Sequence, residues 1–91
     1  MNIEEKYICP CCGNRTFTDP TPGSFDICPV CFWEDDNIQY NDPFNKGGAN
    51  KVSLSEARKN YEQLGAMELR LKGCVREPTQ DEKTEKLERE K

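Results

Sequence analysis

The chain has 91 residues, of which 34% are hydrophobic and 33% are charged, and its formal net charge is −4. A chain this short and polar forms one small domain with a modest core, and a bound metal is a common supplement to the stability of such a domain. The negative charge argues against nucleic-acid binding, which needs a basic surface, so we expect no nucleic-acid partner.

The N-terminal residues lack the apolar core of a signal peptide, and no window is long and apolar enough to span a bilayer. We therefore expect a cytoplasmic protein with no membrane partner. Six cysteines in a reducing compartment favour metal binding over disulfides. The absence of histidine excludes histidine general-base catalysis and mixed Cys/His zinc sites.

Two C-x-x-C pairs organise the first third of the chain. They lie in Cys9-Pro10-Cys11-Cys12-Gly13 and in Cys28-Pro29-Val30-Cys31, and proline follows the first cysteine of each pair. The gap between the pairs fits a four-thiolate zinc site, and tetrahedral zinc accepts four thiolates. The sequence therefore predicts one structural zinc ion per chain, with iron as the alternative metal. The predicted ligands are Cys9, Cys12, Cys28 and Cys31.

Short strands are expected beside these cysteine knuckles. The chain enters a strand at Tyr7-Ile8, and residues 15–18 and 24–27 alternate polar and apolar side chains around a turn at residues 19–23. Two short strands that each adjoin a knuckle are typical of a zinc ribbon. The side chains expected to cluster beside the metal are Phe17, Phe25, Ile27 and Phe32.

A long loop is expected over residues 34–52. Its acidic and aromatic content favours a recognition loop for an unknown protein or small ligand, held between the ribbon and a helix. The alternative is a solvated connection in which Trp33 belongs to the core and the acidic residues are plain surface. The residues proposed for recognition are Trp33, Asp35, Asp36, Tyr40 and Asp42.

The helical part is expected over residues 53–75. Ser53 and Glu56 fit a capping box at the start of a helix, and Gly65 fits the position just past its end. Residues 66–75 fit either a strand or a second short helix, and we favour the helix. The apolar face of the first helix consists of Leu54, Ala57, Tyr61 and Leu64.

Together these elements predict a small α+β fold, with zinc-ribbon-like N-terminal β knuckles followed by one or two helices. We expect residues 1–78 to form a single zinc-stabilised domain, with knuckles at 7–33. Residues 79–91 are expected to be a charged, flexible tail, although residues 79–82 could also begin a further helix.

Two cysteines remain outside the predicted zinc site. Cys11 is either a redox-active thiol, an occupant of the variable knuckle position or a competitor for the metal. Cys74 falls on an expected apolar helix face, so we expect a buried structural thiol there. A redox pair between Cys11 and Cys74 is a further alternative, which a reducing cytoplasm disfavours.

Several stretches together carry a resemblance to a known family. They are Tyr7-x-Cys9-Pro10-Cys11-Cys12-Gly13, residues 22–36, Gly47-Gly48-Ala49-Asn50, Ser53-Leu54-x-Glu56-Ala57-Arg58 and Val75-Arg76-x-Pro78. In these stretches, which run from residue 7 to about residue 78, the chain resembles the cysteine-rich CPCC family of small bacterial proteins. The resemblance implies a bacterial protein with a zinc ribbon, and it implies no particular reaction.

The leading functional interpretation is a non-enzymatic, zinc-stabilised binding module with no catalytic residues. The alternative is a rubredoxin-like iron electron carrier, because iron and zinc both accept four thiolates. The short segment between the knuckles and the lack of glycine after Cys31 argue against that alternative. A hydrolase is a third interpretation, which a closed four-cysteine site disfavours because zinc keeps no open position. Its carboxylates would be Glu34, Asp35, Asp36 or Asp42.

Overall fold

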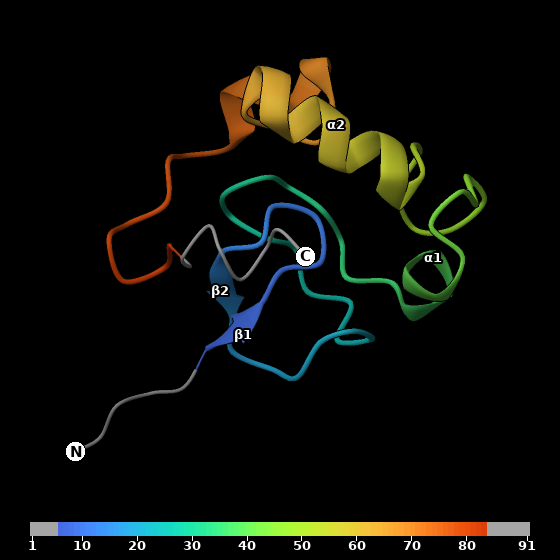
Figure 1. The fold of residues 1–91 in the computed structure, drawn as a ribbon, viewed down its shortest axis with the longest axis horizontal. Helices are drawn as coiled ribbons and strands as arrows, with labels where there is room; N and C mark the ends of the chain where they lie inside the picture. The colour runs from blue at the N-terminus through green and yellow to red at the C-terminus, as the bar shows by residue number, and fades with distance from the viewer. Residues whose placement is uncertain (1–5, 84–91) are drawn as a thin grey trace.

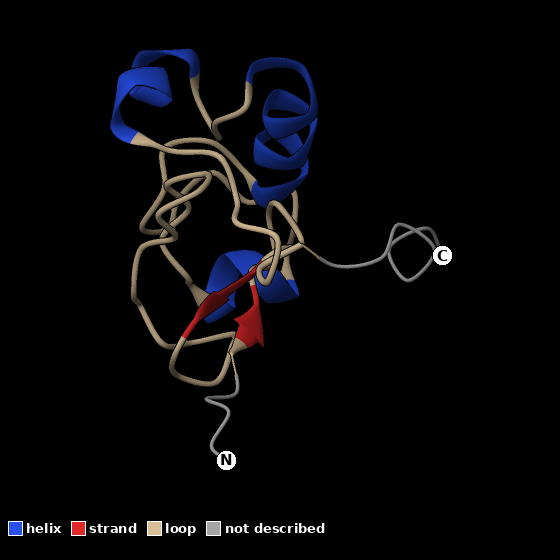
Figure 2. Ribbon diagram, turned by 90° about the vertical axis from the view of Figure 1, so that its left-hand side faces the viewer, coloured by secondary structure: helices blue, strands red, loops and turns tan. Residues whose placement is uncertain are grey.

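The computed structural model describes residues 6–83. Within this part of the chain, two short strands are followed by helices: β1 (Tyr7–Ile8), β2 (Arg15–Phe17), α1 (Asn37–Asn41), α2 (Leu54–Leu64) and the 3-10 helix η1 (Leu69–Cys74). The strands lie at one end of the molecule and α2 lies at the other, with the knuckle loops between them (Figures 1 and 2). This arrangement confirms the predicted small α+β class with a zinc-ribbon-like N-terminal part.

Strands β1 and β2 pair antiparallel across the first knuckle. Tyr7 lies opposite Phe17 and Ile8 lies opposite Arg15, so the register shifts between the two pairs. The strand predicted over residues 24–27 does not form. Only an isolated bridge between Ile27 and Glu34 occurs there, because Phe25 has a φ of 61° that interrupts the extended backbone.

The expected apolar cluster beside the metal is half correct. Phe17 is 2% exposed and Phe32 packs against the core, but Phe25 and Ile27 are 52% and 47% exposed. Alternation predicts that a strand has two faces and does not say which face is buried. Ile27 and Glu34 form the bridge on the outer face, whereas the neighbours of Glu34 in the chain point into the core.

Helix α2 begins and ends where the sequence predicted. The Ser53 hydroxyl accepts a hydrogen bond from the Glu56 amide at 3.1 Å, which caps the first turn. Gly65 adopts the left-handed conformation with a φ of 84°, and its amide donates to the Tyr61 carbonyl at 2.9 Å. The fully buried side chains of Leu54 and Ala57 place α2 against the knuckles.

The segment after α2 forms the short helix that we favoured, in the 3-10 form. Leu71 is buried, and the amide of Met67 donates to the Cys31 carbonyl at 2.9 Å, which ties this segment to the second knuckle. Cys74 is exposed, so the expectation of a buried thiol was wrong. It is the last residue of η1, where the chain becomes extended at Val75.

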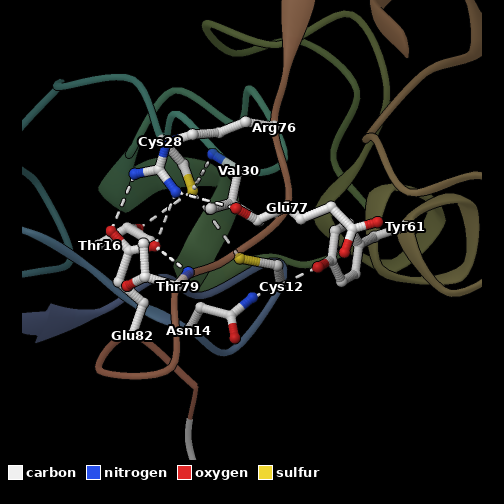
Figure 3. Close-up of polar contacts among 10 residues, drawn as sticks. All are labelled: Cys12, Asn14, Thr16, Cys28, Val30, Tyr61, Arg76, Glu77, Thr79 and Glu82. Carbon is white, nitrogen blue, oxygen red and sulfur yellow. Dashed lines mark hydrogen bonds and ion pairs between the residues drawn. The ribbon is translucent and has the colours of Figure 1, made fainter.

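Residues 75–83, which we name the C-terminal strap, lie along the two knuckles (Figure 3). The Arg76 amide donates to the Pro29 carbonyl at 3.2 Å, and the Arg15 amide donates to the Glu82 carbonyl at 2.7 Å. The Arg76 guanidinium donates to both carboxylate oxygens of Glu82, each at 2.9 Å. Residues 80–82 form a turn, and the further helix that could begin there would lie, like the rest of the expected tail, outside the described residues.

Candidate metal centre

The structure brings together the sulfur atoms of the four cysteines that the spacing singled out. Cys9, Cys12, Cys28 and Cys31 are each at most 1% exposed, and their sulfur atoms all lie within 4.8 Å of one another. The Cys9–Cys31 and Cys12–Cys28 sulfur separations are 3.6 and 3.8 Å. A tetrahedron with metal–sulfur bonds of about 2.3 Å has edges of about 3.8 Å, so one metal ion fits among them.

Each knuckle is a tight turn closed by a backbone hydrogen bond. The Gly13 amide donates to the Cys9 carbonyl at 2.9 Å, and the Phe32 amide donates to the Cys28 carbonyl at 2.8 Å. Gly13 and Phe32 have φ values of 81° and 74°, so both occupy the left-handed region. The second knuckle therefore has the same turn as the first although it lacks a glycine.

The backbone also donates to sulfur within each knuckle. The amide of Cys11 lies 3.4 Å from the Cys9 sulfur, and the amide of Val30 lies 3.4 Å from the Cys28 sulfur. The hydroxyl of Thr16, on β2, lies 3.1 Å from the Cys28 sulfur (Figure 3). These donors stabilise negative charge on sulfur, and such outer contacts orient and tune metal ligands.

The four thiols perturb one another strongly because they are buried together. Burial raises the pKa of the Cys9 thiol and of the Cys31 thiol. Hydrogen bonds from Cys12 and Cys31 lower the pKa of the Cys28 thiol, and its contact with Thr16 acts in the same direction. Four buried thiolates repel one another unless a cation lies between them, so the cluster is suited to a divalent metal ion.

The fifth cysteine of the knuckles is buried next to this group but does not belong to it. Cys11 is 5% exposed, and its sulfur is not among the four that lie close enough to share one ion. It lines a cleft on the outer side of the first knuckle. The cluster itself is closed by four protein ligands, which is the arrangement of structural metal sites rather than catalytic ones.

Three of the five proposed recognition residues lie in the interior. Trp33 and Asp35 are 0% exposed and Asp36 is 4% exposed, which corrects their expected position on the surface. One Asp35 oxygen accepts from the amide and the hydroxyl of Ser24, both at 2.9 Å. Asp36 caps α1, and its second oxygen accepts from the Ala49 amide at 2.8 Å. In this conformation these two carboxylates hold the chain in place.

The expected loop is a folded segment built on two buried amide side chains to which the sequence analysis assigned no role, although Asn50 lies in one of the stretches that carry the family resemblance. Gln39, on α1, donates to the carbonyls of Asn45, Asn50 and Val52, and it accepts from the backbone and side chain of Asn50. The Asn50 side chain also pairs with both backbone groups of Glu34, each at 2.9 Å. No local pattern marks these two residues, since their partners lie up to sixteen residues away.

The other two proposed recognition residues are on the surface. Tyr40 is 41% exposed, and Asp42 is also exposed. Around them, Ile38 and Phe44 are 58% and 77% exposed. The role of this segment in recognition stays a prediction, and only its exposed side chains are placed to contribute.

A small, zinc-ribbon-like fold with a buried four-cysteine cluster defines the class of protein. The sequence matches the family described as cysteine-rich CPCC over residues 7–82, so the chain belongs to that family. No curated protein matches the chain. Among residues 6–83, no helix is long and apolar enough to cross a membrane.

Proposed function

We propose that this chain is a non-enzymatic binding module whose fold is held by one structural zinc ion. The observation that carries the proposal is the closed cluster of four buried sulfur atoms, all within 4.8 Å of one another. Four protein ligands leave zinc no position for a substrate or a reactive water. The candidate carboxylates for hydrolysis, Asp35 and Asp36, are buried in hydrogen bonds that organise the chain.

The binding role is supported by the exposed apolar side chains. Ile38, Tyr40 and Phe44 are between 41% and 77% exposed within seven residues. Contiguous exposed apolar patches mark contact surfaces, and these three neighbouring residues are our candidates for such a patch. We infer a bacterial cytoplasmic protein that binds a protein or small ligand, with no nucleic acid or membrane as partner, because the net charge is −4 and the thiols need a reducing compartment.

Substitution of single cysteines tests the structural zinc. Cys28→Ser should abolish stoichiometric zinc binding and unfold the knuckles, since about 10–16 kcal/mol of metal-binding energy is folding energy in such sites. Cys11→Ser is the matched control and should keep one zinc ion per chain. Native mass spectrometry and circular dichroism under reducing conditions measure both outcomes. Full zinc retention by Cys28→Ser together with zinc loss by Cys11→Ser would refute the ligand assignment.

An iron electron carrier is the second candidate, and the second knuckle favours it. Phe32 reaches the same left-handed conformation as Gly13, so the missing glycine no longer argues against a rubredoxin-like pair of turns. Both turns direct an amide at a sulfur atom, and hydrogen bonds to sulfur tune the potential of iron–thiolate sites. Protein from iron-replete cells should be colourless under the zinc proposal. A stoichiometric thiolate-to-iron absorption band would establish the iron carrier instead.

A further inference from the structure

A cleft of about 570 Å³ lies on the outer side of the first knuckle and is not part of the metal centre. Its volume falls within the range of small-ligand sites, which is about 300–1,000 Å³. We propose that this cleft binds a carboxylate carried on an apolar group, with Arg58 as the anion-binding residue. The inference rests on the proposed binding function and gives it a location and a ligand class. The lining residues used here are Ile8, Pro10, Pro22, Tyr40, Arg58 and Glu62.

Arg58, on α2, lies at the cleft and is held there by a hydrogen bond to the first knuckle. Its Nε donates to the Pro10 carbonyl at 2.9 Å, which fixes the guanidinium against the knuckle. Two other arginines, Arg70 and Arg76, form ion pairs with carboxylates, whereas none of the ion pairs between residues 6 and 83 includes Arg58. The two terminal nitrogens of a guanidinium match the two oxygens of a carboxylate, so an arginine fixed at a cleft and free of ion pairs within residues 6–83 is suited to bind one.

The remaining walls provide an apolar surface for the rest of the ligand. Ile8 and Tyr40 are among the large exposed apolar side chains, at 45% and 41%, and both line this cleft. Pro10 and Pro22 add rigid apolar surface to the same cleft. A ligand with an apolar group beside its carboxylate would cover surface that is otherwise left in water. Tyr40, predicted from the sequence as a recognition residue, acquires a specific contact role in this proposal.

The walls come from separate parts of the chain but are fixed to one another. The Thr21 hydroxyl donates to the Ile8 carbonyl at 2.8 Å, which joins the turn before Pro22 to β1. The bond from Arg58 to Pro10 joins α2 to the knuckle. A site held by such bonds before binding loses little freedom when its ligand arrives.

The local charge favours a monoanion over a dianion. Glu62 lies in the same cleft, one helical turn beyond Arg58, and four thiolates with one divalent ion would add a net charge of −2 behind the knuckle. A phosphate dianion would therefore meet one cation and several negative charges. A carboxylate carries a single charge, which the arginine balances.

Titration of the metal-loaded, ¹⁵N-labelled protein with model carboxylates tests the proposal. The probes are acetyl-Ala-Leu, which represents a peptide C-terminus, and 4-methylpentanoate, which represents a free acid. Each carboxylate is compared with its neutral amide. Phenyl phosphate serves as the dianionic comparison. Gly13 and Thr21 also line the cleft, so their amide signals report on it. At least one carboxylate should shift these signals with a dissociation constant near 1 mM, and its amide should bind about tenfold more weakly. The better carboxylate identifies the source of the ligand.

Variants assign the binding to Arg58. Arg58→Gln should weaken carboxylate binding about tenfold. Arg58→Lys should weaken it less, since lysine keeps the positive charge but lacks the two parallel hydrogen-bond donors of the guanidinium. Lys59→Gln makes the same charge change at the neighbouring exposed position, outside the cleft, and should leave binding unchanged. Zinc content of each variant shows that the fold is intact.

Two results would overturn the proposal: no carboxylate shifts the cleft signals at about ten times the expected dissociation constant, or amides and carboxylates bind equally. A carboxylate that shifts only signals remote from the cleft counts against it in the same way. These results would leave the proposed function standing, because a partner could still contact Ile38 and Phe44. The proposed function fails separately, if the Cys28→Ser variant keeps its zinc and fold.

Discussion

At the scale of single residues, the metal centre depends on groups that contact sulfur without being ligands. Two backbone amides and the Thr16 hydroxyl direct hydrogens towards the cluster. Phe32 occupies a left-handed conformation that costs a non-glycine residue about 1–2 kcal/mol. Metal binding of about 10–16 kcal/mol outweighs that cost, and the packing of the Phe32 ring against the core offsets part of it.

Replacement of Thr16 should lower the affinity of the cluster for its metal ion. Thr16→Val keeps the shape of the buried side chain and removes the hydroxyl that lies 3.1 Å from the Cys28 sulfur. We expect metal affinity to fall about tenfold, measured by competition with a chromogenic chelator, because outer contacts of this kind contribute about 10–100-fold. Thr16→Ser retains a hydroxyl and should lose much less. Equal affinities for the valine variant and the wild type would show that this contact does not support the ligand.

At the scale of elements, residues 34–52 behave as a small folded unit and not as a flexible connection. Gln39 and Asn50, which are 0% and 3% exposed, satisfy backbone groups of Val52 and Glu34 that no strand or helix partner reaches. Buried polar groups need such partners, and removing one leaves the others unsatisfied. The unit is tight where Gly48 passes over Asp36 and Gln39.

A methyl group at position 48 should therefore destabilise the protein. In Gly48→Ala the new carbon would overlap an Asp36 carboxylate oxygen and would lie 2.6 Å from the Gln39 side chain. We expect the free energy of unfolding to fall by about 2 kcal/mol, measured by urea denaturation, because overpacking forces the neighbours to shift. Gly73→Ala is the matched control, since nothing lies within 4 Å of its added carbon. Similar stabilities for the two variants would contradict the packing described here.

Local signals predicted part of this structure well. The spacing of the cysteines grouped the four sulfur atoms, and Ser53 with Gly65 marked both ends of α2, because each of these signals acts within a few residues. The fold of residues 34–52 could not be predicted in this way. Amide side chains are usually exposed, and the contacts that bury Gln39 and Asn50 join residues eleven positions apart.

The outward position of Phe25 and Ile27 had a different cause. Their spacing matched a half-buried strand, but the segment forms one bridge and a left-handed residue. Trp33 is buried, so Glu34, the next residue, and its bridge partner Ile27 face outwards. Which segments pair in this way is set by tertiary packing and not by local sequence.

At the scale of the whole molecule, the C-terminal strap connects the end of the domain to both knuckles. Its Glu82 is 8% exposed and accepts two hydrogen bonds from Arg76, and the Thr79 amide donates to it at 3.0 Å. These contacts lower the pKa of the Glu82 carboxyl to about 2. The hydrogen bonds from Arg76 have the largest effect, burial opposes them, and the bond from Thr79 lowers the pKa further. Hydrogen bonds to the ionised carboxylate dominate because burial alone would raise its pKa.

This pKa makes a specific contribution to the pH dependence of stability. A carboxyl group whose pKa is lower in the folded state stabilises the protein above its unfolded pKa of about 4.3 and loses that contribution as the pH falls towards about 2. Glu82→Gln should lower the free energy of unfolding by about 2 kcal/mol at pH 7. The difference from the wild type should stay constant down to about pH 5 and shrink below about pH 4.3.

The comparison needs equal metal occupancy in both proteins at each pH, which native mass spectrometry verifies. Glu77→Gln is the matched control, because its side chain is exposed and makes the same charge change within the strap. A difference between wild type and Glu82→Gln that does not change between pH 7 and pH 3 would contradict the proposed linkage.

The pairing of the Asn50 side chain with Glu34 has a consequence for how copies of this protein behave in concentrated solution. Ile27 borders Glu34 on one side, and the Glu34 N–H and C=O on the other side are both taken by Asn50. A strand edge with free backbone groups is a template on which further chains can add, and natural proteins block such edges. Here one amide side chain takes the place of a neighbour strand at Glu34, so this edge offers no free backbone groups on which another copy could add.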